Sequence, residues 1–364
     1  MNSHKEKRLQ RSRLLPLGGR RAKRGGSDPA RRSRRKQRGA ALLTAMIIVA
    51  LIATLAASMI WQQWRAVQVE AAERARTQSA WILSGALDWA RLILREDARN
   101  GGPDSLGEPW AVPLEEARLS TFLAADKSNT DDAPDAFLSG AITDAQARYN
   151  LTDLVSGGRI DPVEMDKLQR LCETIGVSAD VATSIAAGMR DASPITPPAP
   201  PASGVAGASV PAAAPAPEAP ANPPLLPRSV AQLSWFGIAP DALLALEPYV
   251  VILPIPTPIN VNTAPREVLV AAIPGLDLAT AERIVQARQR VPMKSSPGDV
   301  EALAPAVPAA SFAGTAVSSS FFEVRGRLRL ADVVLEQRSL VQRRGIDVFV
   351  IQRERVASRD LPGG

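Results

Sequence analysis

A run of 21 uncharged residues, Ala40 to Ile60, constrains this chain more than any other feature. At about 1.5 Å per residue, an α-helix of this length spans roughly 30 Å, the thickness of a bilayer's hydrocarbon core. Trp61 and Trp64 follow, where aromatic side chains favour the membrane interface. The run predicts a single membrane-spanning helix over residues 40–64.

The segment before this helix, residues 1–39, is strongly basic. It holds 15 of the 43 Lys and Arg residues and 2 of the 37 Asp and Glu residues, so 28 basic and 35 acidic residues remain after it, a net charge of about −7. The positive-inside rule then places the basic leader in the cytoplasm and the body of the chain outside it. The overall positive charge therefore does not indicate nucleic-acid binding.

Gly39 lies immediately before the apolar run, whereas a secretory signal is cleaved after its apolar segment. Cleavage after Gly39 would remove the leader and leave the hydrophobic helix on a mature chain that starts at Ala40. A plain signal anchor is the alternative that hydropathy alone allows.

The helix is expected to continue past the membrane toward Arg95, because no Gly or Pro follows directly where the apolar stretch ends, and the segment 100–103 is expected to stop it. Beyond the membrane it becomes amphipathic, and one face can pack on a globular domain. That face carries Leu83, Leu87, Ala90 and Leu94. With a short strand at 136–142, residues 65–143 are expected to form the first part of that domain.

An acidic loop precedes the strand. Closely spaced oxygen ligands can hold calcium, although EF-hand spacing is missing and a solvated loop is the alternative. The candidate ligands are Asp126, Asn129, Asp131, Asp132 and Asp135.

Two short helices are predicted within residues 144–191. Leu168, Leu171, Cys172 and Ile175 mark the first, which Gly176 closes, and Ser178 caps the second, which ends near Met189. Residues 192–227 are rich in Pro and Ala and are expected to form a linker or a disordered insertion.

Helical signals return within residues 228–310. A helical hairpin is predicted there, with Thr263 as the cap of its first helix and a second helix from Ala279. DNA-binding hairpins hold phosphate at a Gly-x-Gly turn, but here Asp277 replaces the second glycine. A packing role is therefore favoured and no nucleic acid is expected. A membrane-anchored DNA-binding protein of the competence type remains the alternative.

The C-terminal part, residues 311–364, alternates in polarity. Phe322, Val324, Leu328 and Leu330 predict a buried strand face, while Glu323 and neighbouring arginines predict a wet one. Two further strands, at 333–341 and 348–351, would continue an antiparallel meander, with 343–345 as the turn. The fold class is α+β.

The chain lacks the residues that most kinds of enzyme catalysis require. The only histidine is His4, in the leader, and the only cysteine is Cys172, which we interpret as a buried apolar residue. Ser-His-Asp catalysis, Cys-His catalysis and His-ligated zinc are therefore excluded in a chain cut after Gly39. We expect no enzyme and no required cofactor; an envelope enzyme using only Asp and Glu is the remaining alternative.

Four segments together resemble the K-type minor pseudopilins of the type II secretion system, also called the general secretion pathway protein K family. They are the junction Gly39-Ala40, which looks like a type IV prepilin junction, and the stretches 144–151, 260–276 and 322–355. The resemblance implies cleavage after Gly39 by prepilin peptidase and N-methylation of Ala40. It also implies a single-pass protein of the inner membrane with a periplasmic globular part.

The same resemblance implies a pilin-like sheet domain, split by an inserted, mainly helical domain that is SAM-like or helix-hairpin-helix-like. Pilins generally carry Glu at the fifth mature position, where this chain has Thr44, and lacking that Glu is typical of K-type members. In the family this absence is tied to the pseudopilus tip. Expected partners are the I-type and J-type minor pseudopilins and other pseudopilins, in a complex that primes pseudopilus assembly and supports export of folded proteins across the outer membrane. Some family members bind calcium in the globular domain.

Overall fold

The computed structural model describes residues 37–119, 136–193, 223–330 and 333–356. The chain forms two units, Met1–Ala72 and Glu73–Gly364, and helix α1 (Gln37–Asn100) contributes to both. Gly101 follows α1 with φ of 68°, a left-handed conformation that suits glycine and ends the helix. The predicted continuation of the helix beyond the membrane segment is confirmed.

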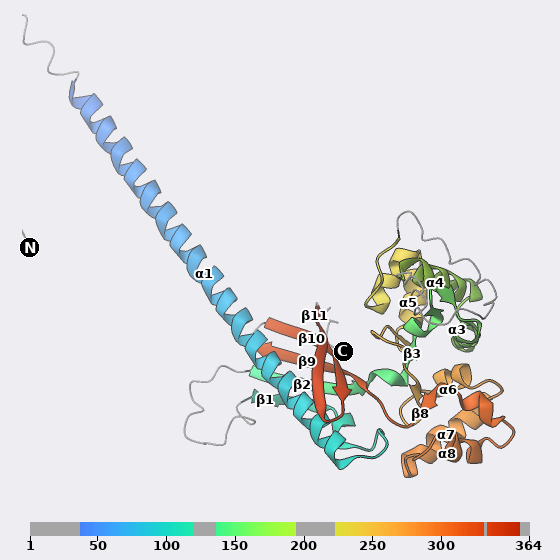
Figure 1. Cartoon of the computed structure of the whole chain (residues 1–364). Coiled ribbons are helices and arrows are strands. Elements are labelled where there is room, and N and C mark those ends of the chain that lie inside the picture. Colours follow the sequence, from blue (N-terminus) through green and yellow to red (C-terminus); the bar gives the residue numbers. More distant parts are fainter. Residues whose placement is uncertain (1–36, 120–135, 194–222, 331–332, 357–364) are drawn as a thin grey trace, which may run out of the picture. The chain divides into compact units, whose positions relative to one another are not determined.

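A five-stranded antiparallel sheet packs against the second half of α1 (Figure 1). Its order is β1-β2-β9-β10-β11, so strands from before and after a long insertion lie side by side. The strands are β1 (Leu114–Arg118), β2 (Ala136–Asp144), β9 (Phe321–Leu330), β10 (Val333–Arg344) and β11 (Asp347–Val356). The predicted α+β class is confirmed.

The predicted apolar face of α1 forms the core beneath this sheet. Leu83, Leu87, Ala90 and Leu94 are all buried, with Leu94 fully so. They meet Phe322, Val324 and Leu328 of β9, which the alternating pattern assigned to a buried face. Helical and strand periodicity therefore agree on a single interface.

Two details of the C-terminal prediction need correction. Glu323 is buried rather than on a wet face, because Arg148, Arg325 and Arg338 all pair with it. The predicted turn 343–345 is only partly correct: β10 continues to Arg344 and β11 begins at Asp347, so Gly345 lies in a two-residue turn while residues 343 and 344 belong to β10. Arg343 instead forms ion pairs inside the fold, a role that spacing does not reveal.

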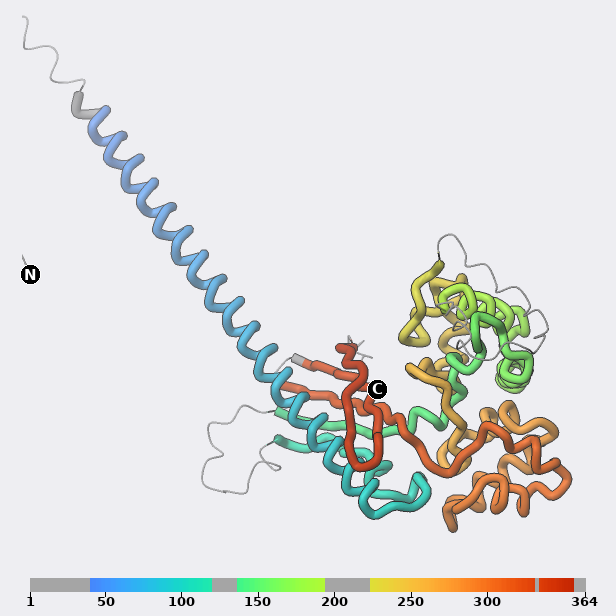
Figure 2. Tube along the Cα trace, in the orientation of Figure 1, coloured from blue at the N-terminus to red at the C-terminus, as the bar shows by residue number. Residues whose placement is uncertain are grey.

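The chain leaves the sheet after β2 and returns to it at β9, and the described residues between 145 and 320 form a mainly helical insertion (Figure 2). One hydrophobic core runs through this insertion, from Tyr149 to Phe312. Its helices are α3 (Pro162–Ile175), α4 (Ala179–Ala192), α5 (Pro240–Leu246), α6 (Arg266–Ala272), α7 (Leu278–Arg290) and α8 (Gly298–Leu303), with the 3₁₀ helices η2 (Ala145–Ala147), η3 (Leu151–Leu154), η4 (Val230–Phe236) and η5 (Ala309–Phe312).

Short strand pairs connect these helices. β3 (Tyr149–Asn150) pairs in parallel with β6 (Val250–Val251), β7 (Ile259–Asn260) pairs in parallel with β8 (Thr315–Ala316), and β4 (Val155–Ser156) pairs antiparallel with β5 (Arg159–Ile160). Each pair joins segments of the insertion to one another. A further 3₁₀ helix, η1 (Pro109–Ala111), precedes β1.

Most predicted helix caps occur as expected. Gly176 ends α3 with φ of 74°, and the Ser178 hydroxyl accepts from the Asp180 amide at the start of α4. The Thr263 cap is wrong: Pro265 precedes α6 without a side-chain cap, and the Thr263 hydroxyl donates to Asp144 instead. A buried acceptor from another element outcompetes the local backbone there.

Candidate functional site

The start of α1 holds the predicted processing residues. Because α1 begins at Gln37, Gly39 and Ala40 both lie in its first turn. Thr44, at the fifth position after the junction, donates its hydroxyl to the carbonyls of Ala40 and Ala41, both at 3.0 Å. Its hydrogen bonds are thus made within the helix, and it offers no negative charge to a neighbouring chain. Cleavage after Gly39 stays a prediction.

The first half of α1 has the character of a membrane span. Its mean hydropathy reaches 2.6, and none of the most apolar window is buried within the fold. It is the single helix among the described residues that is long and apolar enough to cross a bilayer. Exposed Leu, Ile and Met side chains cover this part of the helix on all sides, as lipid contact requires.

A second apolar surface on α1 was not predicted. Trp81 and Trp89 are 74% and 52% exposed, although both follow the membrane segment. Gly85 lies midway between them, and a methyl group added there would meet nothing within 4 Å. The spacing of four residues puts all three on one stripe of the helix, which we call the Trp81/Trp89 stripe. Its signal in the sequence was the pair of tryptophans itself.

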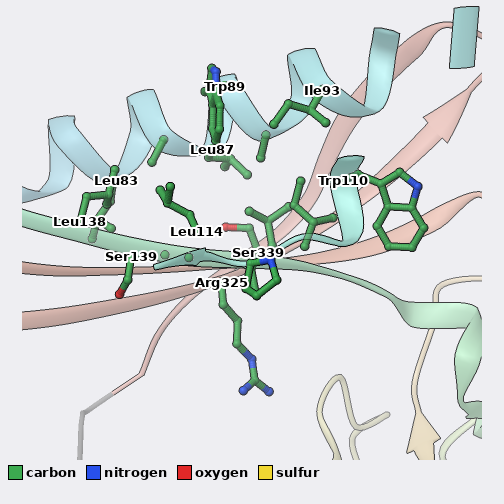
Figure 3. Close-up of a pocket in the computed structure, with 18 of the residues that line it drawn as sticks. Leu83, Leu87, Trp89, Ile93, Trp110, Leu114, Leu138, Ser139, Arg325 and Ser339 are labelled. Atoms are coloured by element: carbon green, nitrogen blue, oxygen red, sulfur yellow. The ribbon is translucent and has the colours of Figure 1, made fainter. Parts of the chain in front are cut away.

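An apolar cavity of about 250 Å³ lies between part of α1 and the sheet (Figure 3). Leu83, Leu87 and Ile93 line it from α1, Leu138 lines it from β2 and Leu114 from β1. The Arg325 side chain points to the opposite side of the sheet (Figure 3). The cavity offers apolar contacts and no cluster of groups for chemistry.

The junction between the sheet and the insertion is a buried polar network centred on Asp144, the last residue of β2. Its carboxylate accepts hydrogen bonds from the Gln146 amide, Asn260 Nδ2, Thr263 Oγ1 and Ser319 Oγ at 2.6–2.9 Å. Burial raises the pKa of Asp144, while these hydrogen bonds act in the opposite direction. Two of the segments that carried the resemblance, 144–151 and 260–276, meet here.

Gln146 and Asn150 extend this junction. Gln146 Oε1 accepts from the amides of Ser320 and Phe321, so it fixes the point where the chain re-enters the sheet. Asn150 Nδ2 donates to the Ile255 carbonyl, and its Oδ1 accepts from the Leu253 amide. Each polar residue of the segment thus joins two distant parts of the chain.

Three carboxylates near the end of α1 could in principle hold a metal ion. The carboxylate oxygens of Asp97, Asp104 and Glu108 lie within 4.8 Å of one another. Arg343 already pairs with Asp97 at 2.7 Å and with Asp104 at 2.6 Å, so a guanidinium supplies the positive charge there. The calcium ligands predicted from sequence, Asp126 to Asp135, lie outside the described residues, and that site stays a prediction.

The helical hairpin of α6 and α7 lacks the arrangement of a phosphate site. Asp277 accepts from the Thr280 amide at 2.8 Å, so its own carboxylate occupies the start of α7. These hydrogen bonds lower the pKa of Asp277. Arg266 pairs with Glu267 and Glu282. The charges of Asp277 and Arg266 are thus used within the fold, which favours the packing interpretation.

Comparison with known families identifies the insertion. Two family models, both described as type II secretion system protein K, match residues 147–255 and 259–317. A curated relative from Pseudomonas aeruginosa, named type II secretion system protein K, is 29% identical over 91% of this chain and 95% of its own length. Relatives of the same name from Pectobacterium carotovorum and Klebsiella pneumoniae are also 29% identical, over 88% and 87% of this chain and 97% and 95% of theirs.

A solved structure has the same fold. It is the crystal structure of the GspK-GspI-GspJ complex from enterotoxigenic Escherichia coli, one chain of which matches with a TM-score of 0.57 and 20% identity. The match covers 79% of this chain and 99% of that one. The split sheet, its helical insertion and the relatives along most of the sequence agree: this chain is similar to type II secretion system protein K over most of its length.

Proposed function

We propose that this chain is cleaved after Gly39 and joins the tip of a periplasmic pseudopilus, where it acts as a scaffold in the export of folded proteins. One observation carries this proposal above the others. A single helix is apolar at its first half and packed on a pilin-like sheet at its second, and that sheet is interrupted by the insertion of residues 145–320. The helix suits assembly in a fibre, whereas the insertion is too bulky to repeat along a shaft.

Thr44 also supports a place at the tip of the pseudopilus. A pilin subunit within a shaft uses a carboxylate at this place to neutralise the terminal amine of a neighbouring subunit. Thr44 has no charge, and its hydroxyl is bonded to Ala40 and Ala41 of its own helix. A tip subunit has no subunit above it that needs such a partner.

The proposed partners are I-type and J-type minor pseudopilins, by analogy with the GspK-GspI-GspJ complex of the related structure. We assign the contact to the Trp81/Trp89 stripe, because exposed tryptophans with a small residue between them suit close packing of a second helix. The buried face of α1 is unavailable, since Leu87 and Leu94 contact the chain's own sheet. No catalytic role is proposed.

The N-terminal mass of the membrane-extracted protein tests this function. With active prepilin peptidase, the chain should start at methylated Ala40; without it, the leader should remain. The processed protein should then co-purify with I-type and J-type partners expressed with it. An intact leader under both conditions would contradict the proposed processing and indicate a plain signal anchor. Processing without capture of the partners would contradict only the proposed place in the tip complex.

A further inference from the structure

A cavity of about 550 Å³ lies between the loop that follows α1 and the C-terminal turn of α7. The loop contributes Pro103 and residues 105–108, and the α7 side contributes residues 288–292 and Lys294. Three cationic side chains line the cavity, Arg288, Arg290 and Lys294, against the single carboxylate of Glu108. None of these cations belongs to the junction or to the α1 surfaces described above.

Arg288 is the unusual member of this group, because it is a buried charge that forms no ion pair among the described residues; Glu282, whose charge acts on it, pairs with Arg266 instead. It is 7% exposed, and its Nη1 donates to the Val261 carbonyl at 2.5 Å. Its Nε is buried with no hydrogen-bond partner, and it forms no ion pair with any described carboxylate. Burial lowers the pKa of Arg288 to about 10, and the charge of Glu282 only partly opposes this shift. An uncompensated buried charge is costly, so a stable fold normally supplies an opposite charge.

The neighbouring polar groups do not supply that charge. Glu108 Oε2 accepts from the Ser105 amide at 2.8 Å and from Trp110 Nε1 at 2.9 Å, so it is held by its own loop. Asn262 Oδ1 accepts from the Met293 amide. The exposed side chains of Arg290 and Lys294 form no ion pair among the described residues and add positive charge at the same cavity.

We propose that this cavity binds an oxyanion, with Arg288 as its buried cation and Arg290 and Lys294 as exposed ones. A carboxylate, sulfate or phosphate group would accept charge-assisted hydrogen bonds from the guanidinium groups. The group is supplied either by a free anion or by an acidic side chain of a docked protein, since both present the same oxygens. The site is independent of the proposed place at the pseudopilus tip.

Equilibrium dialysis of the full-length chain in neutral detergent, with radiolabelled sulfate as the probe, tests the site. We expect saturable binding of one sulfate per chain. The variant R290Q/K294Q removes two exposed charges without touching the core, and it should bind about tenfold more weakly. R283Q is the matched control, because Arg283 also lies on α7 but bonds Thr280 and does not line the cavity. R283Q should bind as the unmodified chain does.

R288M removes the buried charge and should abolish saturable binding. If R288M does not fold, the exposed pair variant still decides the result. Absence of saturable binding in the unmodified chain, or equal binding in R290Q/K294Q, would overturn the proposal.

A second arm distinguishes the two sources of the anion. Adding I-type and J-type partners should release bound sulfate if a partner's carboxylate fills the cavity, and should leave it bound if the natural occupant is a free anion. A failure of these partners to assemble would count against the proposed function and would not alter the sulfate result on the chain alone.

Discussion

Asp144 accepts a hydrogen bond from Asn260 Nδ2 at 2.9 Å, although 116 residues separate them in the sequence. Asp144 ends strand β2, and Asn260 lies in the short strand β7. Asn260 Nδ2 also donates to the Asp104 carbonyl, which belongs to the loop after α1. One amide group therefore connects the loop after the long helix, the sheet and the insertion.

Replacing Asn260 with Ala should destabilise the protein by about 2 kcal/mol, because the buried acceptors of Asp144 and Asp104 lose a donor. The free energy of urea unfolding, measured on the full-length protein, checks this value. In a double-mutant cycle, D144A/N260A should cost less than the sum of the two single variants. T183A serves as the control, since Thr183 bonds only its own helix on an exposed face. Strict additivity would mean that the two side chains act separately.

Asp153 should lower the free energy of unfolding as the pH rises, whereas a carboxylate whose pKa is depressed by an ion pair has the opposite effect. Burial raises the pKa of Asp153 to about 7, with a contribution from Glu164. The folded state therefore binds more protons than the unfolded state between pH 4 and pH 7, and stability falls as the pH rises through this range. D153N keeps an acceptor for the Thr257 amide but does not titrate.

Comparing D153N with the unmodified protein by urea unfolding at several pH values checks this expectation. The variant should gain stability relative to the unmodified protein as the pH increases from 4 to 7, by at most about 1.4 kcal/mol per pH unit. A constant difference across this range would show that Asp153 titrates normally.

The spacing of apolar residues along the sequence correctly predicted which side chains of α1 and β9 are buried. The burial of Leu83, Leu87 and Leu94 followed from three- and four-residue spacing, and that of Val324 and Leu328 followed from alternation. What the sequence could not predict were polar side chains whose partners are far away in the chain. Glu323 looked exposed because the alternating pattern gives no hint of Arg148, which lies 175 residues earlier.

The candidate sites divide in the same way. The roles proposed for Gly39, Ala40 and Thr44 depend on adjacent residues, so the sequence alone suggests them, and they stay predictions. Local sequence predicts a helix cap at Thr263, whereas its hydroxyl donates to Asp144, which comes from another element. Likewise, the buried state of Arg288 depends on how α7 packs against Val261, which no local pattern reveals.

Arg343 should be among the most sensitive positions in the sheet. It pairs with Asp97 at the end of α1 and with Asp104 in the next loop, and its Nη2 also donates to the Ser319 carbonyl. R343A leaves both carboxylates buried without their cation, at a cost of about 3–5 kcal/mol. The neighbouring variant R344A is the control, because Arg344 pairs with no carboxylate: it donates hydrogen bonds to Gln342 of its own strand and lies over the Phe349 ring.

The loss in R343A should shrink as the pH is lowered from 7 to 5. Burial already raises the pKa of Asp97 and of Asp104, and removing Arg343 takes away a charge that opposes that rise. In the variant the pKa of each carboxyl is therefore higher in the folded state than in the unfolded state. The folded state binds more protons, so the free energy of unfolding falls as the pH increases. Urea unfolding at both pH values gives the comparison, and an equal loss at pH 5 and pH 7 would contradict it.

The Trp81/Trp89 stripe gives the last prediction, which concerns assembly rather than stability. W81A/W89A should weaken capture of I-type and J-type partners by about tenfold or more, because buried tryptophans contribute strongly to interfaces. The free energy of unfolding should change less than partner capture does, since Trp81 is 74% exposed and Trp89, which also lines the cavity between α1 and the sheet, is 52% exposed. Replacing Gly85 with Leu should weaken capture as well, by blocking close approach of a second helix.

L244A, which removes an exposed apolar side chain of the insertion, is the control. Co-purification from membranes, quantified against the processed protein, measures the effect, and unchanged capture in W81A/W89A would move the partner surface away from this stripe.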